Sequence, residues 1–288
     1  MLWQIEETEK MAPDVRMLLD MKEILYDKRW LQKNVGKLKD LEIYSTYRGV
    51  CKPSDEAAIR KTGLRYDVTV IPPFMMGDEY VKTAGHYHPI AIDDLTFPEV
   101  YQVLEGEALF LIQKVDNFDR HNLIDVAFAK AKAGDVFVVP PNFGHVTINS
   151  SKKRLVIAKW GAEGVKTIHE PIGRMCGAAY FFTEDGWVRN LRYGLVPNLR
   201  EIKCKPMDDI YNYVSDLKRL AFLKNPTIRP EKTELPATKN LPEQKSAPEP
   251  KMEFKAQPKA EPEANAPSEK MPEDKAQEKP GKYVPIGF

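Results

Sequence analysis

Eight short runs rich in β-branched and aromatic residues follow one another between residues 41 and 160. They read EIYSTYRGV, RYDVTVI, VYQVLEG, ALFLIQK, IDVAFAKA, DVFVVP, VTINS and RLVIAKW. Gly, Pro, Asn and Asp separate these runs, which is typical of an all-β sandwich or barrel. We therefore expect an all-β domain whose barrel spans about residues 41–200.

Turn residues support this interpretation. Gly106 separates VYQVL from ALFLIQK, and Gly134 precedes DVFVVPP. A glycine can take the positive φ that a tight hairpin requires. AAYFF and GWVRNLRY predict one further hairpin at the edge of the barrel.

Segments with helical spacing of apolar residues precede and follow the predicted barrel in the sequence. Apolar residues recur at helical intervals within 14–39, which predicts one or two amphipathic helices, and again within 207–224, which predicts a helix that closes the domain. All four Trp precede residue 190, whereas residues 225–282 contain one aromatic residue, Phe254, among many Pro, Lys, Glu and Ala. We expect one folded domain over 1–224 and a disordered tail over 225–288.

Charge and cysteine content exclude several classes of protein. The net charge is +1 with acids and bases interspersed, so nothing favours nucleic acid as a partner. Cys51, Cys176 and Cys204 are widely spaced and predict reduced thiols. The first twenty residues contain no apolar run of signal-peptide or membrane-span length. We expect a cytoplasmic protein that does not contact membranes.

Three of the five histidines lie in two short stretches, Gly85-His86-Tyr87-His88 and Gly144-His145. Residues i and i+2 of a strand share a face, so His86 and His88 should project together. Glu99 begins the next strand and could add a carboxylate, while His145 could supply a third imidazole. Three histidines and one glutamate suit a first-row divalent ion with open positions for substrate or water. His121 and His169 lack such neighbours and are expected to be solvent-facing loop residues.

These stretches resemble the paired motifs of the cupin superfamily, whose fold is a double-stranded β-helix or jelly-roll barrel. His86, His88, Glu99 and Gly106 match the first motif; Gly134, Pro140, His145 and Asn149 match the second. Two departures are visible. The loop from His88 to Glu99 is longer than usual, and Asn142 stands where the second motif commonly has glycine.

Within the cupins, TAGHYHP, PEVYQVLEGEALFLIQ and VPPNFGHVTIN resemble the cupin-type glucose-6-phosphate isomerases of archaea and some bacteria, and the likeness runs from about residue 17 to 160. The resemblance implies a homodimer that interconverts glucose 6-phosphate and fructose 6-phosphate in glycolysis and gluconeogenesis. It implies one metal ion, with Fe²⁺ expected first and Mn²⁺, Ni²⁺ or Zn²⁺ also compatible.

The resemblance also implies a binding site for the sugar phosphate. Its phosphate would contact Tyr44, Thr69, Thr83 and the amide of Gly85, which are groups that donate hydrogen bonds to phosphate oxygens. Trp160 lies near where the family has an aromatic residue that lines the sugar pocket. Read from the sequence alone, it could equally be a core residue.

For the chemical step, a metal would act as a Lewis acid on the sugar oxygens. Glu99 is the favoured base for proton transfer through a cis-enediol, and Tyr101 could hydrogen-bond a sugar hydroxyl. A hydride shift, which needs no protein base, stays open. Two other functions also remain: another metal-dependent cupin enzyme, such as a dioxygenase or a different sugar-phosphate isomerase, or a non-catalytic cupin that binds sugar or metal.

Overall fold

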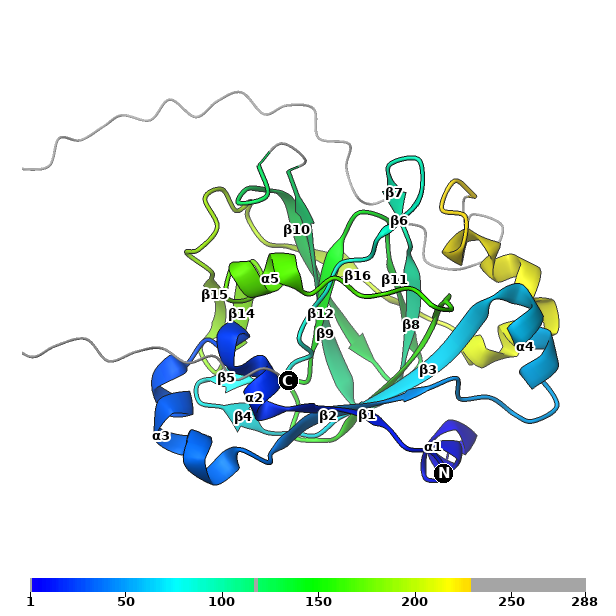
Figure 1. Cartoon of the computed structure of the whole chain (residues 1–288), viewed down its shortest axis with the longest axis horizontal. Helices are drawn as coiled ribbons and strands as arrows, with labels where there is room; N and C mark the ends of the chain where they lie inside the picture. Colours follow the sequence, from blue (N-terminus) through cyan, green and yellow to red (C-terminus); the bar gives the residue numbers. More distant parts are fainter. Residues whose placement is uncertain (1, 117–118, 229–288) are drawn as a thin grey trace, which may run out of the picture. The chain divides into compact units, whose positions relative to one another are not determined.

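A computed structural model describes residues 2–116 and 119–228 (Figure 1). The tail predicted from residue 225 onwards therefore lies, from residue 229, outside the described residues. Strands make up most of the regular structure and pair antiparallel except for β10 with β16, so the predicted all-β class is confirmed.

Two sheets form the barrel (Figure 1). The larger contains seven strands, in the order β1 (Asp14–Met17), β2 (Glu42–Arg48), β3 (Leu64–Ile71), β13 (Leu155–Ala162), β8 (Glu99–Glu105), β11 (Asp135–Val139) and β17 (Lys205–Pro206). The smaller contains β12 (Gly144–Ile148), β9 (Glu107–Val115), β10 (Leu123–Lys132) and β16 (Arg200–Lys203). All eight β-rich runs of the sequence form strands of these two sheets.

Two smaller sheets accompany the barrel. The predicted hairpin is confirmed as β14 (Tyr180–Thr183) and β15 (Gly186–Arg189), which extend through β5 (Glu79–Tyr80) to β4 (Met75–Met76). β6 (Ile90–Ile92) and β7 (Leu95–Thr96) form a separate hairpin within the long loop between His88 and Glu99. Gly106 and Gly134 have φ angles of +84° and +91°, as their turns require.

The helices differ in part from the prediction. They are α1 (Trp3–Thr8), α2 (Leu18–Met21), η1 (Lys22–Ile24), α3 (Lys28–Leu38), α4 (Glu56–Thr62), α5 (Glu170–Arg174) and the 3₁₀ segment η2 (Ile210–Leu223). A helix beginning at residue 14 was wrong, because Asp14–Met17 pairs with the edge of β2 as a strand. The closing helix is also irregular: it is of the 3₁₀ type, and Asp216 breaks it with a non-helical φ of −148°.

The seven-stranded sheet is buried on both faces. Its inner face contributes Val103 and Ile157 to a core shared with Phe110 of the smaller sheet. Its outer face contributes Tyr66 and Trp160 to a second core, which η2, α1 and α4 cover. Alternation along β13 therefore directs Ile157 and Lys159 inward and Trp160 outward.

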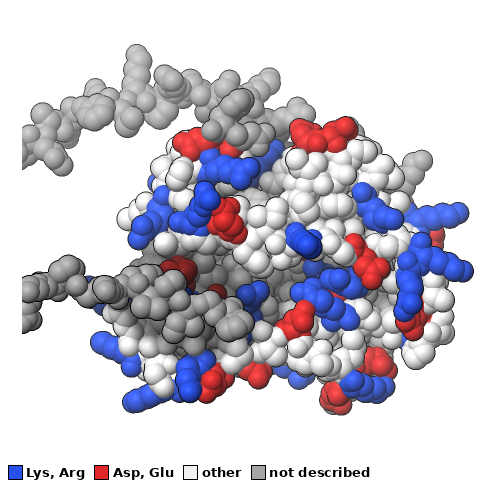
Figure 2. Space-filling view, in the orientation of Figure 1, with Lys and Arg blue, Asp and Glu red and all other residues white. Residues whose placement is uncertain are grey.

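Charged side chains of both signs intermix over the face of the molecule shown in Figure 2. That distribution agrees with the net charge of +1 and gives no one-signed surface on this face. Among the described helices, none is long and apolar enough to cross a membrane.

Candidate metal centre and substrate pocket

His86 and His88 come from an extended segment that pairs with the start of β12. The His86 amide donates to the His145 carbonyl at 3.2 Å, and the His145 amide donates to the His86 carbonyl at 3.0 Å. This pairing fixes the pleat, so His86 and His88 project to the same side and their Nε2 atoms lie 3.2 Å apart. Tyr87, between them, points the other way, where its hydroxyl accepts a hydrogen bond from Gln113 at 2.8 Å.

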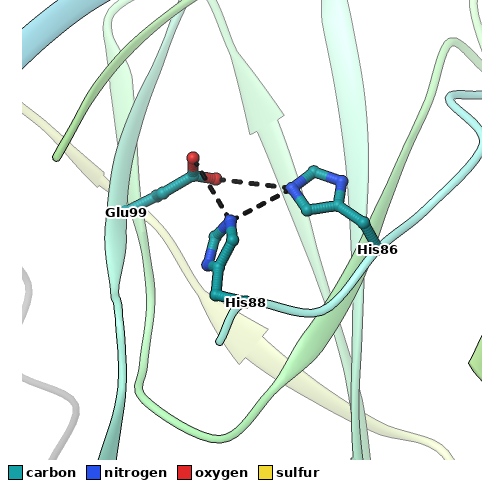
Figure 3. Close-up of side chains that lie close together, drawn as sticks. All are labelled: His86, His88 and Glu99. Carbon is teal, nitrogen blue, oxygen red and sulfur yellow. Dashed lines mark hydrogen bonds and ion pairs between the residues drawn. The ribbon is translucent and has the colours of Figure 1, made fainter. Parts of the chain in front are cut away.

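Glu99 meets these two imidazoles from β8 (Figure 3). Its Oε1 lies 3.5 Å from Nε2 of His88, and its Oε2 lies 4.0 Å from Nε2 of His86. Ligand atoms of His86, His88 and Glu99 all lie within 4.8 Å of one another. Three of the four residues predicted from the sequence to share a metal are thus brought together, and we call these three the triad.

His145 approaches the triad from β12. Its Nε2 lies 3.3 Å from Oε2 of Glu99 and 3.0 Å from the Tyr101 hydroxyl, and its ring centroid lies 4.3 Å from that of His86. Tyr101, two residues after Glu99 on the same face of β8, donates to Oε2 of Glu99 at 2.7 Å. In this arrangement His145 contacts the carboxylate of the triad but lies outside the triad itself.

The donor set fits a divalent metal. Nδ1 of His88 lies 2.7 Å from the Phe97 carbonyl, which can only accept, so Nδ1 donates to it and Nε2 is the nitrogen directed toward His86 and Glu99. Burial, and then the neighbouring His145, lowers the pKa of His86 well below its ordinary value. Burial likewise lowers the pKa of His145. Both imidazoles are therefore neutral near pH 7, the form that binds metal.

Glu99 is an ionised carboxylate despite its burial. Burial acts to raise its pKa, but Lys159 and the histidines around it outweigh that effect and lower the pKa well below the ordinary value for glutamate. The chain thus offers a carboxylate and neutral imidazoles together, which is the donor chemistry that divalent first-row metals accept.

Lys159 is a site residue that the sequence analysis missed. It lies on the inner face of β13, is 15% exposed, and its Nζ donates a hydrogen bond to Oε1 of Glu99. A signal was present in the sequence, because Lys159 interrupts the apolar run RLVIAKW at the position that shares a face with Ile157. Trp160, for which the sequence left open a place in the sugar pocket or in the core, is fully buried in the outer core, where its Nε1 donates to the Ile210 carbonyl at 2.9 Å.

A cavity of about 140 Å³ opens beside the triad. Three residues predicted to contact phosphate, Tyr44, Thr69 and Thr83, line it. The other lining residues are Asp14, Val15, Arg16, Thr46, Arg48, His86, Tyr101, His145, Thr147, Ile157, Lys159, Thr167 and His169. The lining is therefore polar and contains several cationic side chains.

Hydroxyl groups of this cavity are oriented by the backbone. Thr83 Oγ1 accepts from the Thr147 amide at 3.0 Å, and the Tyr44 hydroxyl accepts from the Ala84 amide at 3.4 Å. Thr69 Oγ1 lies 3.0 Å from Thr46 Oγ1. Because Thr83 and Tyr44 already accept from an amide, each keeps its own proton to donate to a ligand.

Gly85, the fourth residue predicted to contact phosphate, is not among the lining residues but lies between Thr83 and His86, which both line the cavity. Its φ is +73°, and an added Cβ would lie 2.6 Å from a methyl carbon of Val146, so both conformation and space require glycine. The Gly85 carbonyl accepts from Nδ1 of His169 at 2.7 Å. His169 is therefore half-buried and lines the cavity, which corrects its placement in a solvent-facing loop, whereas His121 is exposed as expected.

The two departures from the cupin motifs contact each other. Asn142 has a φ of +70°, a conformation that asparagine tolerates better than most residues. The backbone amide of Asn142 donates to Thr96 Oγ1 at 2.7 Å, and its side-chain Oδ1 accepts from the backbone amide of Thr96 at 3.0 Å. Asparagine at this turn thus fastens the longer loop to the barrel close to His88 and Glu99.

Comparison with known proteins agrees with this geometry. The family described as "Glucose-6-phosphate isomerase (GPI)" matches residues 15–197. A glucose-6-phosphate isomerase of Thermococcus litoralis is 28% identical over 148 residues, which are 51% of this chain and 68% of that protein. One of Pyrococcus furiosus is 30% identical over 135 residues, which are 47% of this chain and 62% of that protein.

Among solved structures, an oxalate decarboxylase of Lactobacillus farciminis in complex with formate superposes with a TM-score of 0.33 at 13% identity, covering 56% of this chain and 33% of that one. That overlap is too loose to compare sites. The family match, in contrast, covers most of the barrel and contains every residue of the triad. The chain therefore belongs to the glucose-6-phosphate isomerase family.

Proposed function

We propose that this chain interconverts glucose 6-phosphate and fructose 6-phosphate with one divalent metal ion held by His86, His88, Glu99 and His145. One observation carries the proposal: in a chain of the isomerase family, the triad adjoins a cavity of hydroxyl and cationic groups. The cavity suits an anionic, hydroxyl-rich ligand, and this favours the isomerase over a dioxygenase or a non-catalytic cupin.

When bound, the metal would act as a Lewis acid on the sugar oxygens O1 and O2. Fe²⁺ is the ion we propose, with Mn²⁺, Ni²⁺ and Zn²⁺ compatible with the same ligands. We further propose, from the family resemblance, a homodimer located in the cytoplasm. Analytical ultracentrifugation of the purified full chain tests the dimer directly, and a monomer throughout the micromolar range would exclude it.

Tyr44, Thr69, Thr83 and the Gly85 amide bind the phosphate in this proposal. The free protons of the Tyr44 and Thr83 hydroxyls support it, because phosphate oxygens are acceptors. Holding the phosphate at one end orients the open-chain sugar toward the triad, which lowers the entropic cost of the reaction.

Glu99 is the proposed base, which removes the proton from C2 of the aldose and returns it to C1 through a cis-enediol. Tyr101 donates to Glu99 and would hydrogen-bond a sugar hydroxyl during this transfer. The low pKa of Glu99 makes it a weak base but keeps it ionised, and therefore able to accept a proton, across the neutral pH range.

The test of the proposed function is a coupled assay that follows fructose 6-phosphate to glucose 6-phosphate. We expect turnover by the metal-loaded protein, loss of turnover after chelation, and recovery when Fe²⁺ or Mn²⁺ is added. Unchanged turnover by protein shown by elemental analysis to be metal-free would contradict the metal role. Absence of turnover with all four candidate metals would contradict the isomerase.

Solvent isotope incorporation distinguishes the two routes for hydrogen transfer. If Glu99 carries the proton, deuterium from D₂O should enter C1 or C2 of the sugar during turnover, since a carboxylic acid exchanges its proton with water. Mass spectrometry of the product, quenched before equilibrium, measures this. Product without deuterium after many turnovers would support the hydride shift and remove the role of Glu99 as base.

Replacing Trp160 tests whether this residue belongs to the pocket or to the core. Because its ring lies in the outer core, Trp160→Ala should lower the free energy of unfolding by about 3–5 kcal/mol, while KM for fructose 6-phosphate stays within about twofold in the folded fraction. Urea denaturation and steady-state kinetics measure these two quantities. Trp187→Ala, at a partly buried position, is the control and should cost less stability. A several-fold rise in KM for Trp160→Ala at unchanged stability would return Trp160 to the pocket.

A further inference from the structure

Lys159 occupies the centre of the seven-stranded sheet, on the face that forms the inside of the barrel. Its strand, β13, lies between β8 and β3, where Lys159 is directly opposite Tyr101 on one side and Asp67 on the other. Its side chain is 15% exposed and lines the cavity beside the triad. An ammonium group loses much of its hydration in such a position, so it needs hydrogen-bond partners there.

The partners that the chain supplies leave part of the ammonium group unused. Nζ has three N–H donors, and one of them is hydrogen-bonded to Oε1 of Glu99. Oδ2 of Asp67 is 3.9 Å away, which is an ion-pair distance but too long for a hydrogen bond. Among the described residues, no other hydrogen bond or ion pair of Nζ is recorded.

Asp67 is neutralised by other groups. Nε of Arg65 donates to its Oδ1 at 2.7 Å, and Nη2 of Arg65 donates to its Oδ2 at 3.0 Å. The Gly49 amide also donates to Oδ1 at 3.0 Å. Asp67 therefore does not require Lys159 as its counter-ion, and the two remaining N–H groups of Lys159 are available to an occupant of the cavity.

We propose that Lys159 binds the reacting end of the sugar and donates hydrogen bonds to O1 or O2 as negative charge develops there. The inference rests on the proposed isomerase function. Its basis is geometric: Nζ is hydrogen-bonded to the carboxylate of the triad, so any ligand atom bound to Nζ lies close to the triad. The site then stabilises the enediolate with a fixed protein cation as well as with the metal.

Two ligands that differ at only one end test this role. 5-Phospho-D-arabinonate carries a carboxylate in place of the C1–C2 enediolate, whereas glucitol 6-phosphate carries uncharged hydroxyls there; both have the same phosphate. Isothermal titration calorimetry on the metal-loaded full chain compares wild type with Lys159→Met. We expect Lys159→Met to lose about 10- to 100-fold in affinity for the arabinonate, the worth of a hydrogen bond between charged groups, and less than about threefold for the glucitol.

Controls separate this effect from damage to the metal site or fold. Elemental analysis should show wild-type metal content in Lys159→Met, because the metal ligands are unchanged and a competing cation has been removed from Glu99. Lys130→Met, an exposed lysine on β10 with a side chain 66% exposed, should bind both ligands as wild type does. Lys159→Gln serves as a second variant with the same expected result if Lys159→Met does not fold.

The outcomes distinguish this inference from the proposed function on which it rests. If wild type binds neither ligand, the proposed function fails. If wild type binds both and the Lys159 variants weaken both equally, Lys159 binds phosphate or acts only on structure, and the inference is overturned alone. Unchanged affinity of the variants for the arabinonate overturns it as well.

Discussion

Replacing His88 with alanine is expected to remove both the metal and the activity. The Phe97 carbonyl fixes the orientation of the His88 ring through Nδ1, so the substitution removes an oriented Nε2 from the triad. Loss of a residue that merely supports a ligand costs about 10- to 100-fold in metal affinity or activity, and loss of the ligand itself should cost at least about 100-fold. Metal titration with a competing chelator and the coupled isomerase assay measure the two effects.

His121→Ala is the matched control for His88→Ala. His121 is exposed, and its Nδ1 lies 3.2 Å from a carboxylate oxygen of Asp119 in the connection between β9 and β10, away from the triad in the sequence. Its removal should change neither metal content nor kcat. Retention of full metal content and turnover by His88→Ala would contradict the proposed metal centre.

Replacing Glu99 with glutamine is expected to abolish turnover while the protein keeps much of its metal. The amide is nearly isosteric and leaves all three histidines in place, but it has no charge and cannot accept the C2 proton. Removing a general base typically costs 10²- to 10⁴-fold, so kcat should fall by about 10³-fold or more. Steady-state kinetics, with metal content measured on the same sample, test this.

Glu105→Gln, at the other end of β8, is the control for Glu99→Gln. Glu105 forms an exposed ion pair with Arg154 at 2.7 Å, and such surface pairs contribute little to stability. Its kcat should equal that of wild type. If Glu99→Gln retained kcat within about tenfold of wild type, Glu99 would not be the base.

Much of the barrel and of the triad could be predicted from the sequence. The β-rich runs, separated by turn residues, predicted the strands. The spacing of His86 and His88 predicted that both imidazoles lie on one side, because side chains of a strand repeat every two residues. Glu99 joins them as predicted. These features depend on local backbone geometry, which neighbouring residues determine.

Other features depended on contacts between distant segments. The helical spacing of apolar residues after residue 17 suggested that residues 14–17 belong to the same helix. They instead pair as a strand with the edge of β2. His169 is placed by its hydrogen bond to Gly85, a residue 84 positions earlier in the chain. A pattern within one segment contains no information about such partners.

Lys159 and Trp160 show most clearly which features the sequence alone cannot predict. By itself, the sequence determined that these adjacent residues of β13 point to opposite faces of a sheet. It could not determine which face is the inside of the barrel, because both faces of the seven-stranded sheet are covered by apolar side chains. Only the packing of η2 against one face decided that Trp160 lies in the outer core and that the ammonium group of Lys159 lies beside Glu99.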